Sequence, residues 1–459
     1  MSAWFQAKLA LARGAGALSR RSGRGGGTTL PGRMLLRMAP DAIETLSSRL
    51  EAGSAIVSAT NGKTTTAGMI AEALAAAGRH PVHNRAGSNM TWGVATALLE
   101  QSGNEGLFEV DEAWVPHVVD ALDPHLLVLG NLFRDQLDRY GELEKLADTW
   151  AEVVAEREGR TRFVLNADDP LVADLGRDQD LRRREGVTFF GIEDPRHALP
   201  ELQHAHDAKH CRRCGAPYRY ERAFVGHLGH YACPRCEADR PRPDLAATKI
   251  ELEGMSGSQV SVRAGDEEVA FRLPLPGLYN VYNALAALAT AAELELELGS
   301  AARALEGMRA VFGRVETIEV SSRPVSILLI KNPAGANEVL RTLRLESEPA
   351  GGIDLWLALN DNIADGRDVS WIWDADFELL EGSVARVVCA GTRAPEMAVR
   401  LKYAGWPPER ISVREPIGAS LDEALAEGSG PLYALPTYTA LLELRTLLSD
   451  RGLAPAFWS

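Results

Sequence analysis

The sequence has no apolar run that approaches the ~18–20 residues with which a helix crosses a bilayer. Cysteine is scarce, with five in 459 residues, and nothing in their arrangement indicates disulfide bonds, so we expect a protein of the reducing cytoplasm. The net charge of −14 argues against nucleic acid as the main partner. Hydrophobic residues make up 46% of the chain, as in ordinary soluble proteins, and the length predicts two or three domains.

Acidic residues are absent before Asp41, whereas the same segment is rich in basic residues. The basic residues are Lys8, Arg13, Arg20, Arg21, Arg24, Arg33 and Arg37. Lys8 interrupts the apolar part of the segment, which makes it a poor secretory signal. We therefore expect residues 1–40 to form a basic, partly disordered leader before the first helix. The alternative is a short amphipathic anchor that contacts the anionic inner face of a membrane.

A glycine-containing turn between a predicted strand and a predicted helix is the first segment with clear chemistry. Residues 55–58 form a short apolar run, and residues 64–77 place apolar side chains at helical spacing. In such a turn backbone N–H groups point at phosphate oxygens, a lysine adds a positive charge and a threonine hydroxyl binds magnesium. The predicted ATP contacts are Thr60, Asn61, Gly62, Lys63, Thr64 and Thr65. Val57 stands where the strict pattern has glycine, and an ordinary strand-to-helix turn is the alternative.

Four of the five cysteines form two Cys-x2-Cys pairs with eighteen residues between them. They are Cys211, Cys214, Cys233 and Cys236. Pairs at this separation match a tetrahedral zinc ribbon, and four thiolates leave no open position for a substrate, so the predicted role is structural. The neighbouring His210 and His230 are interpreted as bystanders, and a redox dithiol is the weaker alternative. Cys389 lies in an apolar run that predicts a buried strand.

A dense acidic stretch, DNIADGRDVSWIWD at residues 361–374, follows the apolar run of residues 353–359. That run predicts a buried parallel strand, and α/β sheets bind ligands at the carboxyl ends of their strands. Residues 369–374 are expected to continue as a strand or a turn, with the two tryptophans packed in the domain or at an interface. A solvated loop, a magnesium site and a catalytic carboxylate that orients a histidine are the three interpretations of the acidic residues.

The motif TNGKTTT resembles the ATP loop of the Mur ligases and folylpolyglutamate synthases, which phosphorylate a carboxylate and then attack the acyl phosphate with an amine. Further motifs follow in the order that the family has: FEVDEA (108–113), GNLFRDQLDRYGELE (130–144), VLNADDP (164–170), PGLYNVYNALAALATA (276–291), GRVE (313–316) and KNPAG (331–335). The resemblance implies that Glu109 binds magnesium together with Thr64, with Asp111 and Glu112 as weaker candidates. It also implies that Asn280 contacts adenine and that Arg314 contacts phosphate across the domain cleft.

Several positions depart from the family pattern. Gln136 stands in place of a metal-binding histidine and Trp150 in place of a carbamylated lysine, so a second magnesium held in the usual manner is not expected. Lys331 replaces a histidine, and Ala59 replaces a glycine. Only 57 residues precede Ser58, too few for the family's nucleotide-sugar-binding domain, so we do not expect a UDP-linked precursor to be bound in the usual way.

Taken with the cysteine pairs, the stretch DNIADGRDVSWIWDADFE narrows the resemblance to the Mur ligase-like synthetase subunits of lipid II isoglutaminyl synthase. The resemblance implies ATP-dependent amidation of the α-carboxyl of D-glutamate in the lipid II stem peptide, with ammonia from a GatD-type glutaminase subunit. It further implies that Asp368 completes the Cys-His pair of that glutaminase. The alternatives are a free-standing Mur-type amino-acid ligase and a non-catalytic, ATP-binding scaffold with a zinc ribbon.

The predicted fold class is α/β, and the expected cofactors are ATP, Mg²⁺ and a structural Zn²⁺. Residues 41–312 are expected to form a Mur ligase-like, P-loop central domain, into which residues 205–243 are inserted as the zinc ribbon. Residues 313–459 are expected to form a Rossmann-like domain that contacts the glutaminase.

Overall fold

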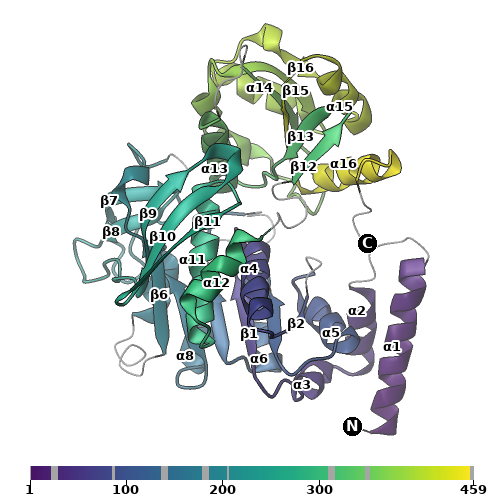
Figure 1. Ribbon diagram of the computed structural model, residues 1–459, viewed down its shortest axis with the longest axis vertical. Helices are drawn as coiled ribbons and strands as arrows, with labels where there is room; N and C mark the ends of the chain where they lie inside the picture. The colour runs from purple at the N-terminus through teal and green to yellow at the C-terminus, as the bar shows by residue number, and fades with distance from the viewer. Residues whose placement is uncertain are drawn as a thin grey trace.

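The computed structural model describes residues 2–21, 29–84, 88–135, 143–177, 186–203, 206–308, 316–346, 352–428 and 430–454. Two sheets dominate these residues, each with helices packed on it (Figure 1). The nine-stranded sheet lies in the lower part of the molecule in Figure 1, and the six-stranded sheet lies above it. None of the helices in the described ranges is both long enough and apolar enough to cross a bilayer.

The nine-stranded sheet has the order β11-β10-β9-β6-β5-β4-β1-β3-β2 and is parallel from β2 to β9. Its strands are β1 (Ser54–Ser58), β2 (Val82–His83), β3 (Gly106–Glu109), β4 (Leu126–Leu129), β5 (Arg162–Asn166), β6 (Val187–Ile192), β9 (Leu245–Leu252), β10 (Ser258–Ala264) and β11 (Glu267–Leu273). Strands β9 to β11 pair antiparallel. All residues of β1, β3 and β4 are buried, as expected of parallel strands that carry helices on both faces.

An antiparallel hairpin is inserted between β6 and β9. It consists of β7 (Arg219–Val225) and β8 (Leu228–Ala232). The four cysteines of the predicted zinc ribbon lie just before and just after this hairpin in the chain.

The six-stranded sheet has the order β12-β13-β17-β14-β15-β16 and is parallel except at the β12–β13 hairpin. Its strands are β12 (Glu316–Val320), β13 (Arg323–Ile327), β14 (Ile353–Ala358), β15 (Val384–Ala390), β16 (Ile411–Val413) and β17 (Leu432–Pro436). Its helices are α13 (Pro333–Arg344), α14 (Ala394–Tyr403), α15 (Ile417–Ala426) and α16 (Tyr438–Asp450). This arrangement confirms the predicted α/β class with a mainly parallel second sheet.

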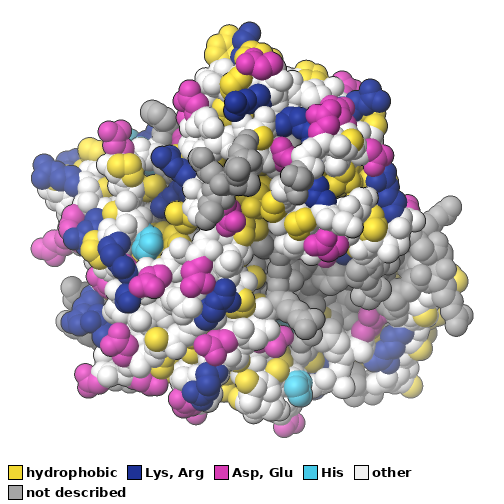
Figure 2. All heavy atoms as spheres, turned by 45° about the horizontal axis from the view of Figure 1, so that its top comes forward, with side chains coloured by type: hydrophobic (Ala, Val, Ile, Leu, Met, Phe, Trp, Pro, Cys, Tyr) yellow, Lys and Arg dark blue, Asp and Glu magenta, His cyan; other side chains and the backbone are white. Residues whose placement is uncertain are grey.

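The basic N-terminal segment forms two helices within its described residues. Helix α1 (Ala3–Arg21) and helix α2 (Leu30–Met38) lie beside α5 (Thr91–Glu100), and α1 forms the outer edge of the molecule in Figure 1. On the face shown in Figure 2, acidic and basic side chains are interspersed, without a large field of one sign. That face therefore offers no broad basic tract for a polyanion.

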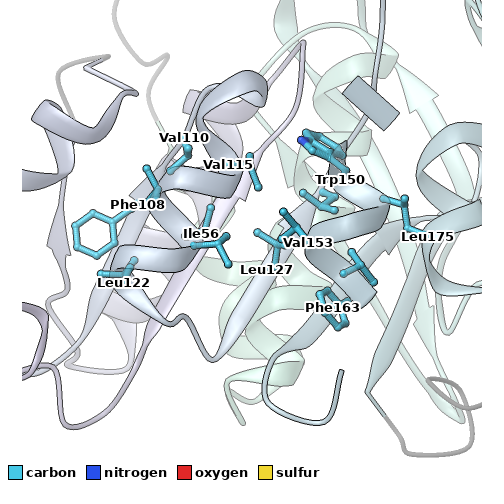
Figure 3. Close-up of a cluster of buried hydrophobic side chains, with 14 of the residues drawn as sticks. Ile56, Phe108, Val110, Val115, Leu122, Leu127, Trp150, Val153, Phe163 and Leu175 are labelled. Carbon is cyan, nitrogen blue, oxygen red and sulfur yellow. The ribbon is translucent and has the colours of Figure 1, made fainter. Parts of the chain in front are cut away.

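The core of the lower part of the molecule is divided by its sheet. Alternate residues of each strand point to opposite faces, so Ile56 faces one layer while Ala55 and Val57 face the other. Helices α4 (Lys63–Ala76), α11 (Leu278–Glu293) and α12 (Leu298–Glu306) cover one face; α3 (Ala42–Ser47), α5, α6 (Val115–Leu122) and α8 (Leu143–Glu156) cover the other. Figure 3 shows the second layer, in which Trp150 of α8 packs near the end of β4. This packing fixes the strand ends from which the candidate site is built.

Candidate functional site

The turn after β1 requires glycine at one position. Gly62 has a φ of 91°, in the left-handed region, and a Cβ atom there would lie 2.0 Å from the side-chain oxygen of Asn283. Helix α4 begins at the next residue, Lys63, one residue earlier than the sequence predicts. The N-terminal N–H groups of α4 are therefore presented at the end of the parallel sheet, which is the arrangement of an anion-binding site.

Lys63 is buried beneath this turn. Its Nζ atom lies 3.1 Å from the carbonyl oxygen of Ala59 and 3.0 Å from Oε2 of Glu112. Burial lowers the pKa of Lys63, but the carboxylates of Glu112, Asp111 and Glu109 outweigh burial and the pKa is raised. Lys63 is therefore a permanently charged cation at the base of the loop, held by a carboxylate that phosphate oxygens can replace.

Thr64 and Glu109 form an oxygen pair at the first turn of α4. The hydroxyl of Thr64 donates to Oε1 of Glu109 over 2.8 Å. Asn84 fixes the backbone of Glu109, since its side chain bonds both the N–H and the carbonyl of that residue at 2.9 and 2.8 Å. A carboxylate and a hydroxyl at this separation fit the hard oxygen ligands that Mg²⁺ prefers. Thr65 is buried in the same turn of the helix.

Asn131 connects the end of β4 to the turn. Its side chain accepts from the N–H of Asn61 and donates to the carbonyl of Asn61, both over 2.9 Å. The hydroxyl of Thr60 accepts from the N–H of Phe133 over 3.1 Å. These bonds fix the turn from outside the strand–helix unit. The motif that contains Asn131 was recognised in the sequence, but its contact with the turn was not predicted.

The second domain reaches the same turn through the start of α13. Asn332 caps α13 by accepting from the N–H of Gly335 over 2.9 Å, and its amide exchanges two bonds with the amide of Asn61, at 3.0 and 3.3 Å. Lys331 donates to the carbonyl of Thr60 over 3.1 Å and forms an ion pair with Asp135. The N-terminus of α13 and a second lysine therefore face the loop, although the sequence marked Lys331 only as a departure from the family pattern.

Asn280 has its side-chain atoms bonded inside the protein. Its Nδ2 donates to the carbonyl of Pro276 over 2.8 Å, and its Oδ1 accepts from Asn283 over 3.0 Å. Asn283, Asn131 and Asn166 instead line a small pocket behind the turn. Asn280 is buried next to Asn283 and does not line this pocket. Two other positions singled out in the sequence, Arg314 and Gln136, lie outside the described residues.

The four cysteine sulfurs converge. Three Sγ–Sγ distances are 3.5 Å, and all four sulfurs lie within 4.8 Å of one another. A tetrahedron of sulfurs about 2.3 Å from a zinc ion has edges of about 3.8 Å, so the donor set fits a single tetrahedral metal ion. His210 and His230 are not part of the cluster, and the ring of His230 instead bonds the carbonyl of Ile192 over 2.8 Å.

Asp168, at the end of β5, joins the inserted hairpin to the sheet. It accepts from the N–H of Ile192 over 2.9 Å, from Arg240 over 2.6 Å and from the hydroxyl of Tyr282 over 2.7 Å. Its side chain is fully buried. The region of the cysteine cluster is thereby anchored to the strand end next to the loop, without contributing a ligand to it.

The acidic stretch of residues 361–374 contains carboxylates in different environments. Asp361 forms an ion pair with Arg393 over 2.9 Å, and Asp374 forms one with Arg134 over 3.5 Å. Asp365 is buried and accepts from the N–H of Thr439 over 2.8 Å. These three carboxylates are engaged in contacts that hold the loop.

Asp368 differs from its neighbours because it is exposed. Its Oδ1 accepts from the N–H of Ser370 over 2.8 Å, and this bond holds the pKa of Asp368 below its ordinary value. The following residues form a 3-10 helix, Ser370–Trp373, which agrees with the expected turn and not with the alternative of a strand. Trp373 is 52% exposed and lies 5.8 Å, between ring centroids, from the exposed Tyr403. A charged carboxylate and, five residues further along the chain, one ring of an aromatic pair are thus both exposed at the surface.

Residues 57–229 match the family model of the Mur ligase middle domain, and residues 329–441 match the model of the MurT ligase C-terminal domain. The chain is 32% identical over 435 residues to lipid II isoglutaminyl synthase (glutamine-hydrolyzing) subunit MurT of Streptococcus pneumoniae, which covers 94% of each chain. It is 32% identical over 447 residues to the protein of the same name from Staphylococcus aureus, which covers 96% of each chain.

Solved structures share the fold at lower identity. A pseudomurein peptide ligase type C from Methanothermus fervidus has a TM-score of 0.67 at 22% identity, over 87% of this chain and 79% of that one. The MurF ligase from Thermotoga maritima in complex with ADP has a TM-score of 0.58 at 16% identity, over 89% of this chain and 84% of that one. These likenesses establish the Mur ligase fold.

Proposed function

The chain belongs to the MurT family, and we propose that it is the synthetase subunit of a lipid II isoglutaminyl synthase. In this function it uses ATP to amidate the α-carboxyl of D-glutamate, giving D-isoglutamine, in the stem peptide of lipid II during peptidoglycan biosynthesis. The observation that carries the proposal is the buried Lys63 at the start of α4, with the N-terminus of α13 opposite it. Two helix N-termini and two lysines meet at one turn. They place there the positive charge that stabilises a transferring phosphoryl group.

The reaction follows from this arrangement of charge. The γ-phosphoryl group of ATP passes to the substrate carboxylate, and ammonia then displaces phosphate from the acyl phosphate to leave the amide. Lys63 and the N–H groups of the first turn of α4 bind the phosphates, and Lys331 adds positive charge from the second domain. Because both lysines are fixed by the protein before the reaction, little reorganisation is needed as negative charge develops.

Thr64 and Glu109 are the residues that would hold magnesium. When bound, Mg²⁺ neutralises phosphate charge in such ligases. The 2.8 Å separation of the two oxygens and the fixed backbone of Glu109 support this assignment. We also propose that Thr60, Asn61, Gly62 and Thr65 belong to the ATP site through the turn. Asn280 is proposed for the adenine side of the ATP site only through its bond to Asn283. Arg314 is proposed from its motif alone.

Zinc in the cysteine cluster would be structural. Four sulfurs complete a tetrahedral shell, so no position is open to a substrate or to water. Asp168 and Arg240 link this region to the ATP side of the sheet. None of the contacts described for these two residues involves Lys63. Its expected contribution is the stability of the fold around β5 and β6.

Ammonia has to come from a second protein, and we propose a GatD-type glutaminase. Glutamine hydrolysis needs a nucleophilic cysteine with a histidine base. In this chain no histidine follows His230, and the only cysteine after Cys236 is Cys389. Burial raises the pKa of the Cys389 thiol to about 12, which makes it a poor nucleophile. Asp368, charged and exposed, is proposed to complete the partner's Cys-His pair across the interface, to which the exposed Trp373 is proposed to contribute.

Purified protein with ATP, magnesium and lipid II tests the proposal. Ammonium alone should support formation of the amide, and glutamine should support it only when the glutaminase is added. A requirement for an amino acid instead of ammonia would indicate a free-standing ligase, and absence of substrate-dependent phosphate release would indicate a non-catalytic scaffold. Lys63→Ala, which removes the buried cation of the loop, should abolish amidation with either nitrogen source.

A further inference from the structure

Helix α1 carries an apolar strip on its outer face that no other described part of the protein covers. Trp4, Leu11 and Leu18 are 73%, 59% and 70% exposed. They are spaced seven residues apart, so they lie on one side of the helix, and Ala7 and Gly14 fill the positions between them. The residues of the strip therefore recur every three or four positions, as they do on the apolar side of an amphipathic helix, but here that side of the helix faces solvent.

The opposite face of α1 fixes the helix to the protein. Leu9 and Ala12 are buried against the neighbouring helices. Lys8 donates to the carbonyl of Met38 over 2.6 Å, and Arg13 donates twice to the carbonyl of Leu99, at 3.1 and 2.9 Å. Because these contacts set the rotation of the helix about its axis, the strip is held outward at the edge of the molecule (Figure 1).

The charged residues of the N-terminal segment are of one sign. The first 40 residues contain seven basic residues and no acidic one, although the whole chain has a net charge of −14. Arg33 and Arg37 of the adjoining α2 are exposed, and Lys8 lies 5.9 Å from the centroid of the Trp4 ring. An apolar strip with tryptophan at one end, on a segment whose charged residues are all basic, has the chemistry of a helix that lies in the interface of an anionic membrane.

We propose that α1 is a membrane-surface contact that docks the protein on anionic lipid, with the strip of Trp4, Ala7, Leu11, Gly14 and Leu18 inserted among the headgroups. The proposal deepens the proposed function, because a lipid-linked substrate is presented at such a surface. It commits to a lipid occupant because a self-complementary contact would bring the basic segments of two copies together, which their charge opposes.

Sedimentation of the full-length protein with vesicles tests the proposal without ATP or substrate. Binding should be strong to vesicles of phosphatidylcholine mixed with phosphatidylglycerol and weak to vesicles of phosphatidylcholine alone. Salt should weaken the binding to the anionic vesicles, by about fivefold in affinity for each basic residue at the membrane surface. The triple variant Trp4→Gln, Leu11→Gln, Leu18→Gln should reduce partitioning at least about tenfold. A matched control is Leu202→Gln, Leu345→Gln, Val413→Gln, which removes three exposed apolar side chains elsewhere and should bind as the wild type does.

Equal binding of the strip variant and the wild type, or no binding of the wild type to phosphatidylglycerol vesicles, would overturn the proposal. A wild-type dimer that the strip variant converts to monomer, with vesicle binding unchanged, would overturn it as well. A second assay separates it from the proposed function. The strip variant should amidate detergent-solubilised lipid II at the wild-type rate and vesicle-embedded lipid II more slowly, whereas failure of the proposed function would leave the wild type inactive on both.

Discussion

Replacing Glu112 by glutamine tests whether Lys63 is a phosphate ligand that pairs with a carboxylate until phosphate binds. The side chains of Lys63 and Glu112 are 8% and 7% exposed, and their charged atoms lie 3.0 Å apart. Glutamine keeps the shape of the side chain but removes its negative charge. The carbonyl of Glu112, which accepts from Trp150 over 3.0 Å, belongs to the backbone and is unaffected. The substitution therefore removes the carboxylate that is paired directly with a buried cation and leaves only the more distant charges of Asp111 and Glu109.

The expected loss is large for a conservative change. Removing one partner of a buried ion pair costs about 3–5 kcal/mol. Because glutamine retains a neutral oxygen that Lys63 can still contact, the expected cost of Glu112→Gln is at the lower end, about 3 kcal/mol. At about 2–4 °C per kcal/mol, Tm without nucleotide should fall by about 6–12 °C. ATP with magnesium should restore much of this loss, because phosphate oxygens supply the missing negative charge to Lys63.

Thermal unfolding with and without a non-hydrolysable ATP analogue and magnesium is the measurement. The nucleotide should raise Tm more in Glu112→Gln than in the wild type. Glu109→Gln is the matched control: its carboxylate accepts from the Thr64 hydroxyl, so Tm without nucleotide should change little while the magnesium-dependent part of the nucleotide shift disappears. Equal nucleotide shifts in Glu112→Gln and the wild type would refute the assignment of Lys63 as the phosphate-binding cation.

The pH dependence has a defined sign. Burial raises the pKa of Glu112, but Lys63 and Lys331 outweigh burial and the pKa is lowered in the folded protein. The contribution of the carboxylate is therefore fully present above the ordinary value of 4.5 and is lost as pH falls through the lowered folded-state pKa. The Tm difference between wild type and Glu112→Gln should be constant from about pH 6 to 9 and should shrink in acid.

Three further predictions concern the other parts of the site. Cys211→Ser should lower Tm by more than about 5 °C without changing the activity of the protein that remains folded; a fully stable but inactive variant would contradict a structural role for the cysteine cluster. Asp368→Asn should abolish glutamine-dependent amidation and spare ammonium-dependent amidation; loss of both in the same assays would place this residue at the ATP site. Asn332→Ala, which removes the link between α13 and Asn61 together with the cap of α13, should lower kcat at least about tenfold and lower Tm by only about 2–4 °C through the lost cap; unaltered kcat would mean that the link has no part in catalysis.

Much of the fold follows from local patterns in the sequence. The apolar runs that become β1, β14 and β15 are buried on both faces, so they predict parallel strands without knowledge of their partners. At residues 369–373 the pattern left a strand and a turn open, and the structure has the turn. Valine and tryptophan alternate there as in a strand, but Ile372 between the tryptophans is the buried residue and Trp373 is exposed, because the segment turns as a 3-10 helix.

The site was predictable where its chemistry is local and was missed where it depends on distant contacts. Lys63 and Thr64 follow from one turn, and the four cysteines follow from their spacing. The pairing of Asn61 with Asn332 joins residues 271 positions apart, and nothing in either motif indicates it. The bonds of Asn280 to Pro276 and Asn283 are likewise visible only once α11 is folded.

Trp150 shows how the departures from the family pattern fit together. The resemblance places it where other members have a carbamylated lysine, a metal ligand, but here the indole is fully buried and donates to the carbonyl of Glu112 over 3.0 Å. It positions the backbone of the residue that holds Lys63 and offers no ligand to a cation. Asp135 is paired with Lys331, so its charge is already neutralised by a protein cation. Lys331 therefore adds a fixed positive charge at the loop, from the start of α13.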